Sequence, residues 1–300
     1  MTPDAPAINR TLYPFTGHYL DVASDVRLHY LDEGHGPPVV MVHGNPTWSF
    51  FYRNLVLRLR GRYRCVVPDH VGCGLSDKPP RSRYPYSLER RIADLTALLD
   101  HLKLDRDVTL VVHDWGGMIG TVWATRFPER VKRLIVLNTA AFHLPKSKRL
   151  PLSLWLGRNT TLGALLIRGA NLFCRAAARW CVTRRPLTPD VRRMYLAPYD
   201  SWAHRVAVLK FVQTIPLVPT DAGYDIVSET ERRLHLLRDR PVLVCWGMRD
   251  FVFDEHFLGQ WQEHFPAAEM HRYDDAGHYI LEDAGDEVGL RVEEFLARTD

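Results

Sequence analysis

The segment from residue 108 to residue 123 constrains the fold of this chain more than any other. Residues 108–112 (VTLVV) form an apolar run rich in β-branched side chains, which predicts a buried strand. Gly116 and Gly117 open the next run, in which apolar residues recur at helical spacing. A strand that turns at once into a helix presents one polar side chain at the apex of the turn, and here that side chain belongs to Asp114.

This strand–turn–helix resembles the nucleophile elbow of the α/β-hydrolases, where the apex residue is usually serine. Serine needs a general base before it becomes nucleophilic. The carboxylate of Asp114 is already ionised at neutral pH, and it attacks carbon to form an ester. The exchange of serine for aspartate therefore predicts chemistry that differs from that of ordinary esterases.

Length and composition suit one α/β domain or one core with an inserted cap. The 300 residues are 46% apolar and 25% charged, which is ordinary for a globular protein, and a net charge of +4 is too small to imply nucleic acid. Residues 1–13 lack the apolar stretch of a signal peptide, and no apolar run is long enough to span a bilayer. The five cysteines form no CxxC pair, so we expect reduced thiols in a cytoplasmic protein.

Strand-like and helix-like runs alternate along most of the chain, which favours a mostly parallel sheet with helices on both faces. An antiparallel pair is expected at 18–31, and Ser87 is expected to cap a helix whose leucines repeat at helical spacing. Further strands are predicted at 38–43, 63–68, 133–137, 241–246 and 269–273.

This alternation stops after residue 138 and returns near residue 220. We therefore predict a helical cap at 141–220, inserted into an α/β-hydrolase core made of 1–140 and 221–300. The cap would cover the active site with its apolar side.

The first part of the predicted cap is basic, since residues 141–189 hold nine Lys or Arg and no Asp or Glu. One interpretation is a solvated face on a cap whose apolar side covers the site. The other is a basic amphipathic surface that associates with a membrane or an acidic partner without inserting. The residues expected to face that partner are Arg168, Arg175 and Arg179. The residues expected to line the path of an apolar substrate are Leu152, Leu154, Trp155, Leu165, Leu166, Phe173 and Trp180.

An α/β-hydrolase needs a nucleophile, an acid and a histidine in that chain order. His278, in the segment 275–278 (DAGH), follows the last predicted strand and is the histidine at the expected place. The acid follows one of two strands. Because residues 138–142 hold no carboxylate, Asp250 is assigned by elimination, with Asp254 as the alternative. The acid would fix the tautomer of His278 and stabilise its charged form.

Two further residues are expected to face the nucleophile. The backbone N–H groups of Asn45 and Trp115 stand where an oxyanion hole forms. Their side chains, an amide and an indole, are uncharged donors that would converge on a leaving anion such as halide or carboxylate. Neither a cofactor nor a metal ion is expected.

Other polar residues near these motifs are expected to be structural. His43 and His113 would make hydrogen bonds beside the site. The Gly-rich segment 68–77 lacks the Lys-Ser or Lys-Thr of a phosphate loop. Its Asp residues are therefore expected to tie the loop to backbone N–H groups.

Together these motifs resemble the haloalkane dehalogenase branch of the α/β-hydrolases. The motifs that carry the resemblance are HGNPT at 43–47, PD at 68–69, GLSDKP at 74–79 and HDWGG at 113–117. Within that branch the chain is most similar to the β-lactone decarboxylases of bacterial long-chain olefin biosynthesis. The supporting segments are 69–79 (DHVGCGLSDKP), 138–142 (NTAAF) and 197–202 (APYDSW).

This resemblance implies conversion of a cis-dialkyl β-lactone to a cis-alkene and carbon dioxide, in company with other enzymes of the pathway. Asp114 would attack either the ring carbon that bears oxygen or the carbonyl carbon. Asn45 and Trp115 would hold the developing carboxylate or oxyanion. His278, oriented by Asp250, would manage protons or charge. A haloalkane dehalogenase is the alternative, because it needs the same nucleophile and the same donors.

Three other functions agree less well with the sequence. Epoxide hydrolases also place Asp at the elbow, but they usually carry an aromatic residue where Asn45 stands. They also need two cap tyrosines, for which Tyr195 and Tyr199 are the candidates. Fluoroacetate dehalogenases usually have Arg where Trp115 stands. A non-catalytic binding protein would not need the triad that this chain carries.

Overall fold

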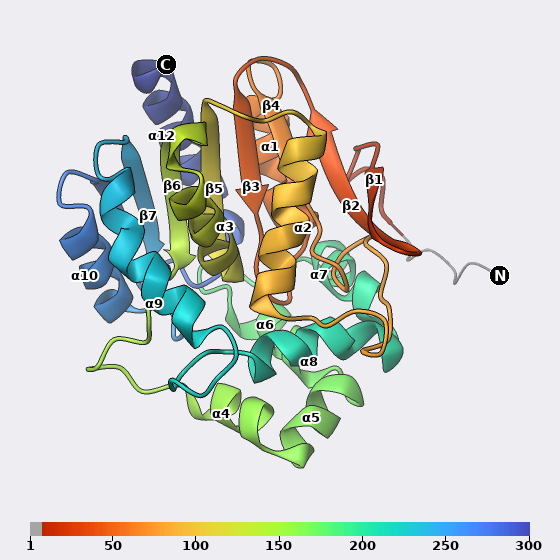
Figure 1. The fold of residues 1–300 in the computed structure, drawn as a ribbon. Coiled ribbons are helices and arrows are strands. Elements are labelled where there is room, and N and C mark those ends of the chain that lie inside the picture. The colour runs from red at the N-terminus through yellow and green to blue at the C-terminus, as the bar shows by residue number, and fades with distance from the viewer. Residues whose placement is uncertain (1–7) are drawn as a thin grey trace.

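The computed structural model describes residues 8–300, in which one eight-stranded sheet forms the centre of the fold (Figure 1). The strand order is β1-β2-β4-β3-β5-β6-β7-β8, and only the β1–β2 and β2–β4 pairs are antiparallel. The mostly parallel sheet and its antiparallel opening are therefore confirmed. The strands are β1 (His18–Ala23), β2 (Val26–Glu33), β3 (Pro38–Val42), β4 (Arg64–Pro68), β5 (Val108–Asp114), β6 (Val131–Thr139), β7 (Val242–Gly247) and β8 (Glu269–Tyr273).

Helices cover both faces of the sheet because its central strands are apolar on both sides. Alternate residues of β3 and β5 enter two different clusters, with Val40 and Val42 on one face and Val39 and Met41 on the other. One face carries α2 (Leu88–His101), α3 (Trp115–Arg126), α9 (Tyr224–Arg233) and α10 (Glu255–His264). The other carries α1 (Arg53–Leu59), α11 (Ile280–Asp283) and α12 (Gly285–Thr299).

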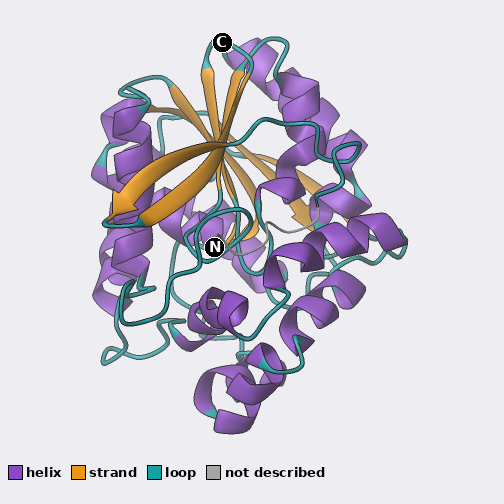
Figure 2. Ribbon diagram, turned by 90° about the vertical axis from the view of Figure 1, so that its right-hand side faces the viewer, coloured by secondary structure: helices purple, strands orange, loops and turns teal. Residues whose placement is uncertain are grey.

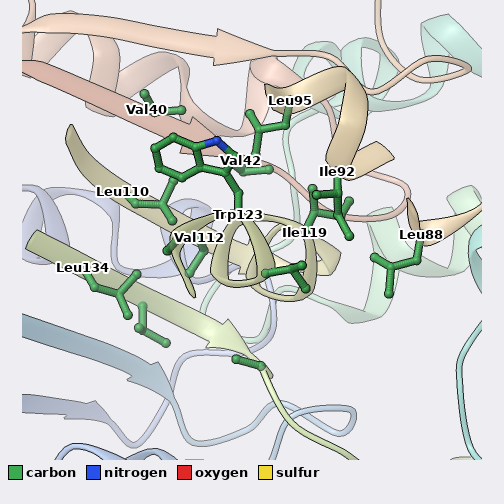
Figure 3. Close-up of a cluster of buried hydrophobic side chains, with 14 of the residues drawn as sticks. Val40, Val42, Leu88, Ile92, Leu95, Leu110, Val112, Ile119, Trp123 and Leu134 are labelled. Carbon is green, nitrogen blue, oxygen red and sulfur yellow. The ribbon is translucent and has the colours of Figure 1, made fainter. Parts of the chain in front are cut away.

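The α3 helix packs closely on the sheet and so fixes the position of its own N-terminus. Figure 3 shows Trp123 of α3 among Val40, Val42 and Leu110 of the strands beneath it. Each such side chain contributes about 2 kcal/mol through burial. The neighbouring helix α2 begins where expected, because the Ser87 hydroxyl accepts a hydrogen bond of 3.2 Å from the Arg90 N–H.

Between β6 and α9 the chain forms five helices that lie beyond the carboxyl ends of the parallel strands (Figures 1 and 2). They are α4 (Leu152–Asn159), α5 (Thr161–Arg168), α6 (Leu172–Trp180), α7 (Pro189–Leu196) and α8 (Val206–Gln213). The division into a core and a separate cap at 141–220 stays a prediction. Within residues 8–300, no helix combines the length and apolar character that crossing a bilayer requires. The signal-peptide prediction concerns a segment whose residues 1–7 lie outside the described part.

Candidate active site

The turn between β5 and α3 places Asp114 at the carboxyl edge of the sheet. Its backbone has φ 50° and ψ −127°, a conformation that is costly for a residue with a side chain. Two close approaches hold the turn. A Cβ on Gly116 would overlap the Val42 carbonyl oxygen, and a Cβ on Gly44 would overlap the Asp114 carboxylate. The Thr139 hydroxyl also donates a hydrogen bond to the Asp114 carbonyl oxygen.

The three residues predicted as a triad lie together in the structure. The Asp250 Oδ2 atom lies 2.7 Å from Nδ1 of His278. On the other side of the ring, Nε2 of His278 lies 3.5 Å from Oδ2 of Asp114. All three side chains are buried. The histidine therefore stands between a carboxylate that can orient it and a carboxylate that can act as a nucleophile.

The carboxylate of Asp250 is held by the loop that follows β7. Its Oδ1 atom accepts hydrogen bonds from the N–H groups of Val252 (2.7 Å) and Phe253 (3.0 Å). Its Oδ2 atom accepts a third from the Asn138 amide at 3.1 Å. The same amide pairs with Gly247, donating to its carbonyl and accepting from its N–H.

Sequence reasoning missed this role of Asn138, which it considered as a position without a carboxylate and as part of the 138–142 segment that supports the family resemblance. The available signal was its place directly before the end of β6, since polar residues at that edge of a parallel sheet meet the site. Asp254, the alternative acid, lies elsewhere. It caps α10 by accepting from the His256 N–H and pairs with Lys148 at 2.5 Å.

The two structural histidines make the hydrogen bonds expected of them. His113 Nε2 lies 2.8 Å from the His278 carbonyl oxygen. Burial lowers the pKa of His113 to about 3, so the neutral ring donates this bond. His43 Nδ1 lies 2.7 Å from the Gly44 carbonyl oxygen, while its Nε2 accepts from the His70 N–H at 3.0 Å. Both rings thus fix backbone that borders the triad.

The Gly-rich loop after β4 is tied by its aspartates, as predicted. Asp69 accepts from the N–H groups of Ser49 (2.6 Å) and Leu75 (2.9 Å), and it lies 2.8 Å from His29 Nδ1. Burial alone would raise the pKa of Asp69, but the His29 hydrogen bond and charge lower it to about 2. Asp77 accepts from the Arg27 N–H at 2.8 Å.

Asn45 and Trp115 border the nucleophile. The Asn45 N–H donates to Asp114 Oδ1 at 2.7 Å, so one carboxylate oxygen already occupies the backbone hole. The Asn45 side-chain amide donates to the Val208 carbonyl oxygen at 3.3 Å, which leaves its second hydrogen free. Trp48, Trp246 and Trp261 donate their indole N–H groups to backbone carbonyls. The Trp115 indole lies at the cavity and finds no acceptor among residues 8–300. Both side chains can therefore donate to an anion.

Burial and charge favour an ionised pair at the site. For Asp114, burial would raise the pKa, but the hydrogen bond and charge of His278 lower it. For His278, burial would lower the pKa, but the charge of Asp250 and the hydrogen bond to Asp114 raise it to about 10. The ring is therefore an imidazolium at neutral pH, facing the ionised carboxylate of Asp114.

These residues form the floor of an apolar cavity of about 240 Å³. Asn45, Asp114, Trp115 and His278 line it, and no Lys or Arg among residues 8–300 does. The walls include Met118, Phe142, Leu144, Leu154, Phe173, Trp180, Val212, Ile215, Phe253 and Phe257. Such a cavity suits a ligand that is apolar except at its reacting centre.

The expected lining was right for three residues and wrong for four. Leu154, Phe173 and Trp180 line the cavity. The other four face outward and are exposed: Leu152, Trp155, Leu165 and Leu166. The reason is that α4 and α5 are apolar on both faces, so periodicity alone did not identify the inner one.

The tyrosines of the epoxide hydrolase alternative are not at the site. Tyr195 donates to Glu282 at 2.5 Å, and Tyr199 donates to the Thr47 carbonyl oxygen at 3.4 Å. Neither lines the cavity. In the part of the chain that the structure describes, no three His, Cys, Asp or Glu side chains are grouped to hold a metal ion.

Comparison with known proteins places this geometry among enzymes. Residues 37–285 match the family model described as the alpha/beta hydrolase fold. The chain is 54% identical to a cis-3-alkyl-4-alkyloxetan-2-one decarboxylase of Shewanella oneidensis, over 97% of this chain and 91% of the relative. It is 45% identical to a protein of the same name from Xanthomonas campestris pv. campestris, over 95% and 97%.

Haloalkane dehalogenases are also similar, at lower identity. The chain is 34% identical to one from Mycolicibacterium paratuberculosis, over 97% of this chain and 96% of the relative. Among solved structures, the haloalkane dehalogenase DatA from Agrobacterium tumefaciens C58 superposes with a TM-score of 0.84 at 26% identity, over 95% and 97% of the two chains.

Proposed function

The chain belongs to the α/β-hydrolase fold family and, within it, to the family of the cis-3-alkyl-4-alkyloxetan-2-one decarboxylases; from this premise we propose that the enzyme converts long-chain cis-dialkyl β-lactones to cis-alkenes and carbon dioxide. The observation that carries this choice is the higher identity to the decarboxylases than to the dehalogenases along nearly the whole chain. The site supplies chemistry that fits it.

In the first step Asp114 acts as the nucleophile. Its Oδ1 atom is held by the Asn45 N–H, whereas Oδ2 faces only His278, so Oδ2 is the freer oxygen. Oδ2 bonds to the ring carbon that bears oxygen, and the ring C–O bond breaks. The electron pair of that bond passes to oxygen, which leaves an alkyl ester on Asp114 and a free carboxylate on the neighbouring carbon.

In the second step the carboxylate leaves as carbon dioxide. The electrons of the broken C–C bond form the alkene, and the C–Oδ2 bond breaks to regenerate the Asp114 carboxylate. The step consumes neither water nor a proton. Attack at the carbonyl carbon would instead leave an alkoxide whose C–O bond must still break, so the route through the oxygen-bearing carbon is the simpler one.

The donors at the site suit a carboxylate that must decompose. Asn45 and Trp115 would hold it with uncharged N–H groups in an apolar cavity. An arginine in their place would stabilise the carboxylate before the reaction and so raise the barrier to loss of carbon dioxide. The His278 imidazolium, held by Asp250, stabilises the negative charge that returns to Asp114 in the second step.

Haloalkane dehalogenation is the second candidate, and the likeness to solved dehalogenases favours it. Asp114 would displace halide from carbon, and His278 would activate a water that splits the ester. This route needs a neutral histidine to accept a proton from water, whereas the decarboxylase route uses a charged one.

The test is one preparation assayed side by side with a synthetic long-chain cis-β-lactone and a panel of chloro- and bromoalkanes. Alkene is measured by gas chromatography and halide by ion chromatography. Alkene from the lactone with halide at background supports the proposal. Intact lactone together with halide release would replace it with dehalogenation.

The setting of the enzyme is also part of the proposal. It acts in the cytoplasm in long-chain olefin biosynthesis, next to the other enzymes of that pathway in a multienzyme assembly. The basic residues of 141–189 support contact with an acidic surface, either a partner enzyme or a membrane. Arg175 and Arg179 are exposed as expected, but Arg168 is held by the Trp202 carbonyl oxygen at 3.0 Å and is a poorer candidate.

A further inference from the structure

The outer faces of α4 and α5 carry several exposed apolar side chains. Leu152 is 70% exposed, Leu162 62% and Leu165 56%. Three more apolar side chains are exposed beside them. We call this set the apolar tip: Leu152, Trp155 and Leu156 on α4, and Leu162, Leu165 and Leu166 on α5.

The apolar tip consists of one face of each of two neighbouring helices. Residues 152, 155 and 156 and residues 162, 165 and 166 repeat the same helical spacing, so each set occupies one face of its helix. The two helices pack against each other. They form the end of the molecule farthest from the carboxyl terminus (Figure 1). The opposite faces of the two helices point into the enzyme, where Gly157 and Ile167 are buried.

Cations without ion-pair partners within residues 8–300 lie on the segments that flank α4 and α5 in the chain. Arg149, Arg175 and Arg179 are exposed, and none has an ion-pair partner within residues 8–300, whereas Arg158 is paired with Asp221 at 2.6 Å. Residues 141–189 hold no acidic residue that could neutralise them. An apolar face bordered by arginines suits the interface of an anionic bilayer, where leucine and tryptophan enter the headgroup region and arginine binds phosphate.

The mouth of the cavity lies beside the apolar tip. Ser153, Trp180 and Phe251 line the cavity and are also exposed, so the opening is bordered by the start of α4, the end of α6 and the loop after β7. Leu154, the next residue of α4, lines the cavity wall. A helix that is apolar toward the cavity and apolar toward the outside offers a continuous path for alkyl chains.

We propose that the apolar tip docks the enzyme on an anionic bilayer, with α4 and α5 in the headgroup region, and that the substrate passes from the bilayer into the cavity between α4 and α6. The identity of the substrate rests on the proposed function, but docking does not. The sequence predicted association without insertion. The exposed leucines instead favour shallow insertion, with no helix crossing the bilayer.

The test measures binding to vesicles of equal parts phosphatidylcholine and phosphatidylglycerol, with phosphatidylcholine vesicles for comparison. The tip variant carries Leu152→Gln, Leu162→Gln and Leu165→Gln. Its matched control carries Leu57→Gln, Leu236→Gln and Leu290→Gln, which change three exposed leucines outside helices α4 to α8. We expect wild type and control to bind the anionic vesicles equally. We expect the tip variant to bind them at least about tenfold more weakly.

The charge contribution is tested separately. The change of Arg149, Arg175 and Arg179 to Gln should weaken binding to the anionic vesicles and reduce its dependence on salt. The control changes Arg62, Arg106 and Arg272 to Gln, three exposed arginines elsewhere. Brominated lipid chains should quench wild-type tryptophan fluorescence more than that of Trp155→Phe.

Three results would overturn the proposal. In the first, the wild-type enzyme binds neither kind of vesicle; in the second, the tip variant binds as well as its leucine control. In the third, sedimentation velocity shows that the wild-type enzyme dimerises through the apolar tip instead of binding lipid. Turnover of a short, water-soluble β-lactone is measured in parallel. The tip variant should retain it, because none of its three residues lines the cavity. If wild type lacks lactone turnover but binds vesicles, the proposed function fails while docking stands.

Discussion

The carboxyl edge of the sheet and the helices above it hold their residues in different ways. At the edge, each carboxylate of the proposed triad is fixed by backbone N–H groups: Asp114 by that of Asn45, which is distant in the chain, and Asp250 by two from its own loop. In α4 and α5 most side chains are apolar and contact the rest of the enzyme through packing, while Arg158 and Arg168 make the polar contacts, to Asp221 and to the Trp202 carbonyl oxygen. The edge therefore determines the reaction, and the helices can vary to select the substrate and its source.

This difference predicts, first, that the edge tolerates no change of the nucleophile. Asp114→Asn keeps the shape of the side chain but removes the ionised oxygen that attacks carbon. Alkene formation should fall by about 10⁴-fold or more, with an unchanged melting temperature. Asp254→Asn is the control, because asparagine caps helices as well as aspartate does, and it should stay within about twofold of wild type. More than a tenth of wild-type activity in D114N would show that another residue attacks.

The second prediction concerns the charge of His278. Its pKa lies above the usual 6.5, so the imidazolium is present at neutral pH and is lost as the pH rises through about 10. Lactone turnover should follow this charge and decline only at high pH. Asp250→Asn should lower turnover by about 10³-fold and move the decline toward neutral pH. A wild-type rate that instead rises with pH near neutrality would indicate the neutral histidine of a hydrolytic mechanism.

A third prediction tests whether the edge depends on its loop. Asp69→Asn removes a buried negative charge that accepts hydrogen bonds from two backbone N–H groups and from His29. We therefore expect a loss of about 3 kcal/mol in the free energy of unfolding. Because the pKa of Asp69 is lowered from 3.8 to about 2, its stabilising effect is present above pH 3.8 and is lost as the pH falls toward 2. Urea denaturation measures both. Asp77 pairs with the half-exposed Arg27, and the change Asp77→Asn should cost less than about 1 kcal/mol in the free energy of unfolding. Equal losses in the two variants would contradict the account.

The fourth and smallest effect is expected in the covering helices. Phe173 lines the cavity, whereas its neighbour Leu172 is 45% exposed and does not. Phe173→Ala should raise KM about fivefold for a long-chain lactone and leave a short-chain one unchanged, because only long chains reach that wall. Leu172→Ala should change neither. A KM that rises equally for both chain lengths would place Phe173 next to the reacting centre instead.

The same difference explains what the sequence could predict. The apolar, β-branched strand runs and the Ser87 cap depend on local pattern, and the structure places these elements as predicted. The chain order of Asp114, Asp250 and His278 could also be read from the sequence, and the structure brings these three residues together. The role of Asn138 depends on a contact between residues 112 positions apart, which no local pattern contains. The inner faces of α4 and α5 could not be identified either. Both faces of these helices carry apolar residues, so the helical spacing does not show which face is buried.

The central claim is that Asp114 releases an alkene without the help of water, and turnover in H₂¹⁸O tests it most directly. After many turnovers with a long-chain cis-β-lactone, the peptide that contains Asp114 is analysed by mass spectrometry. The account predicts an unlabelled Asp114, because the ester breaks at its alkyl carbon. Incorporation of ¹⁸O into the Asp114 carboxylate, together with a hydroxy acid in place of the alkene, would contradict it, because hydrolysis by His278-activated water adds the oxygen of water to the ester carbonyl carbon.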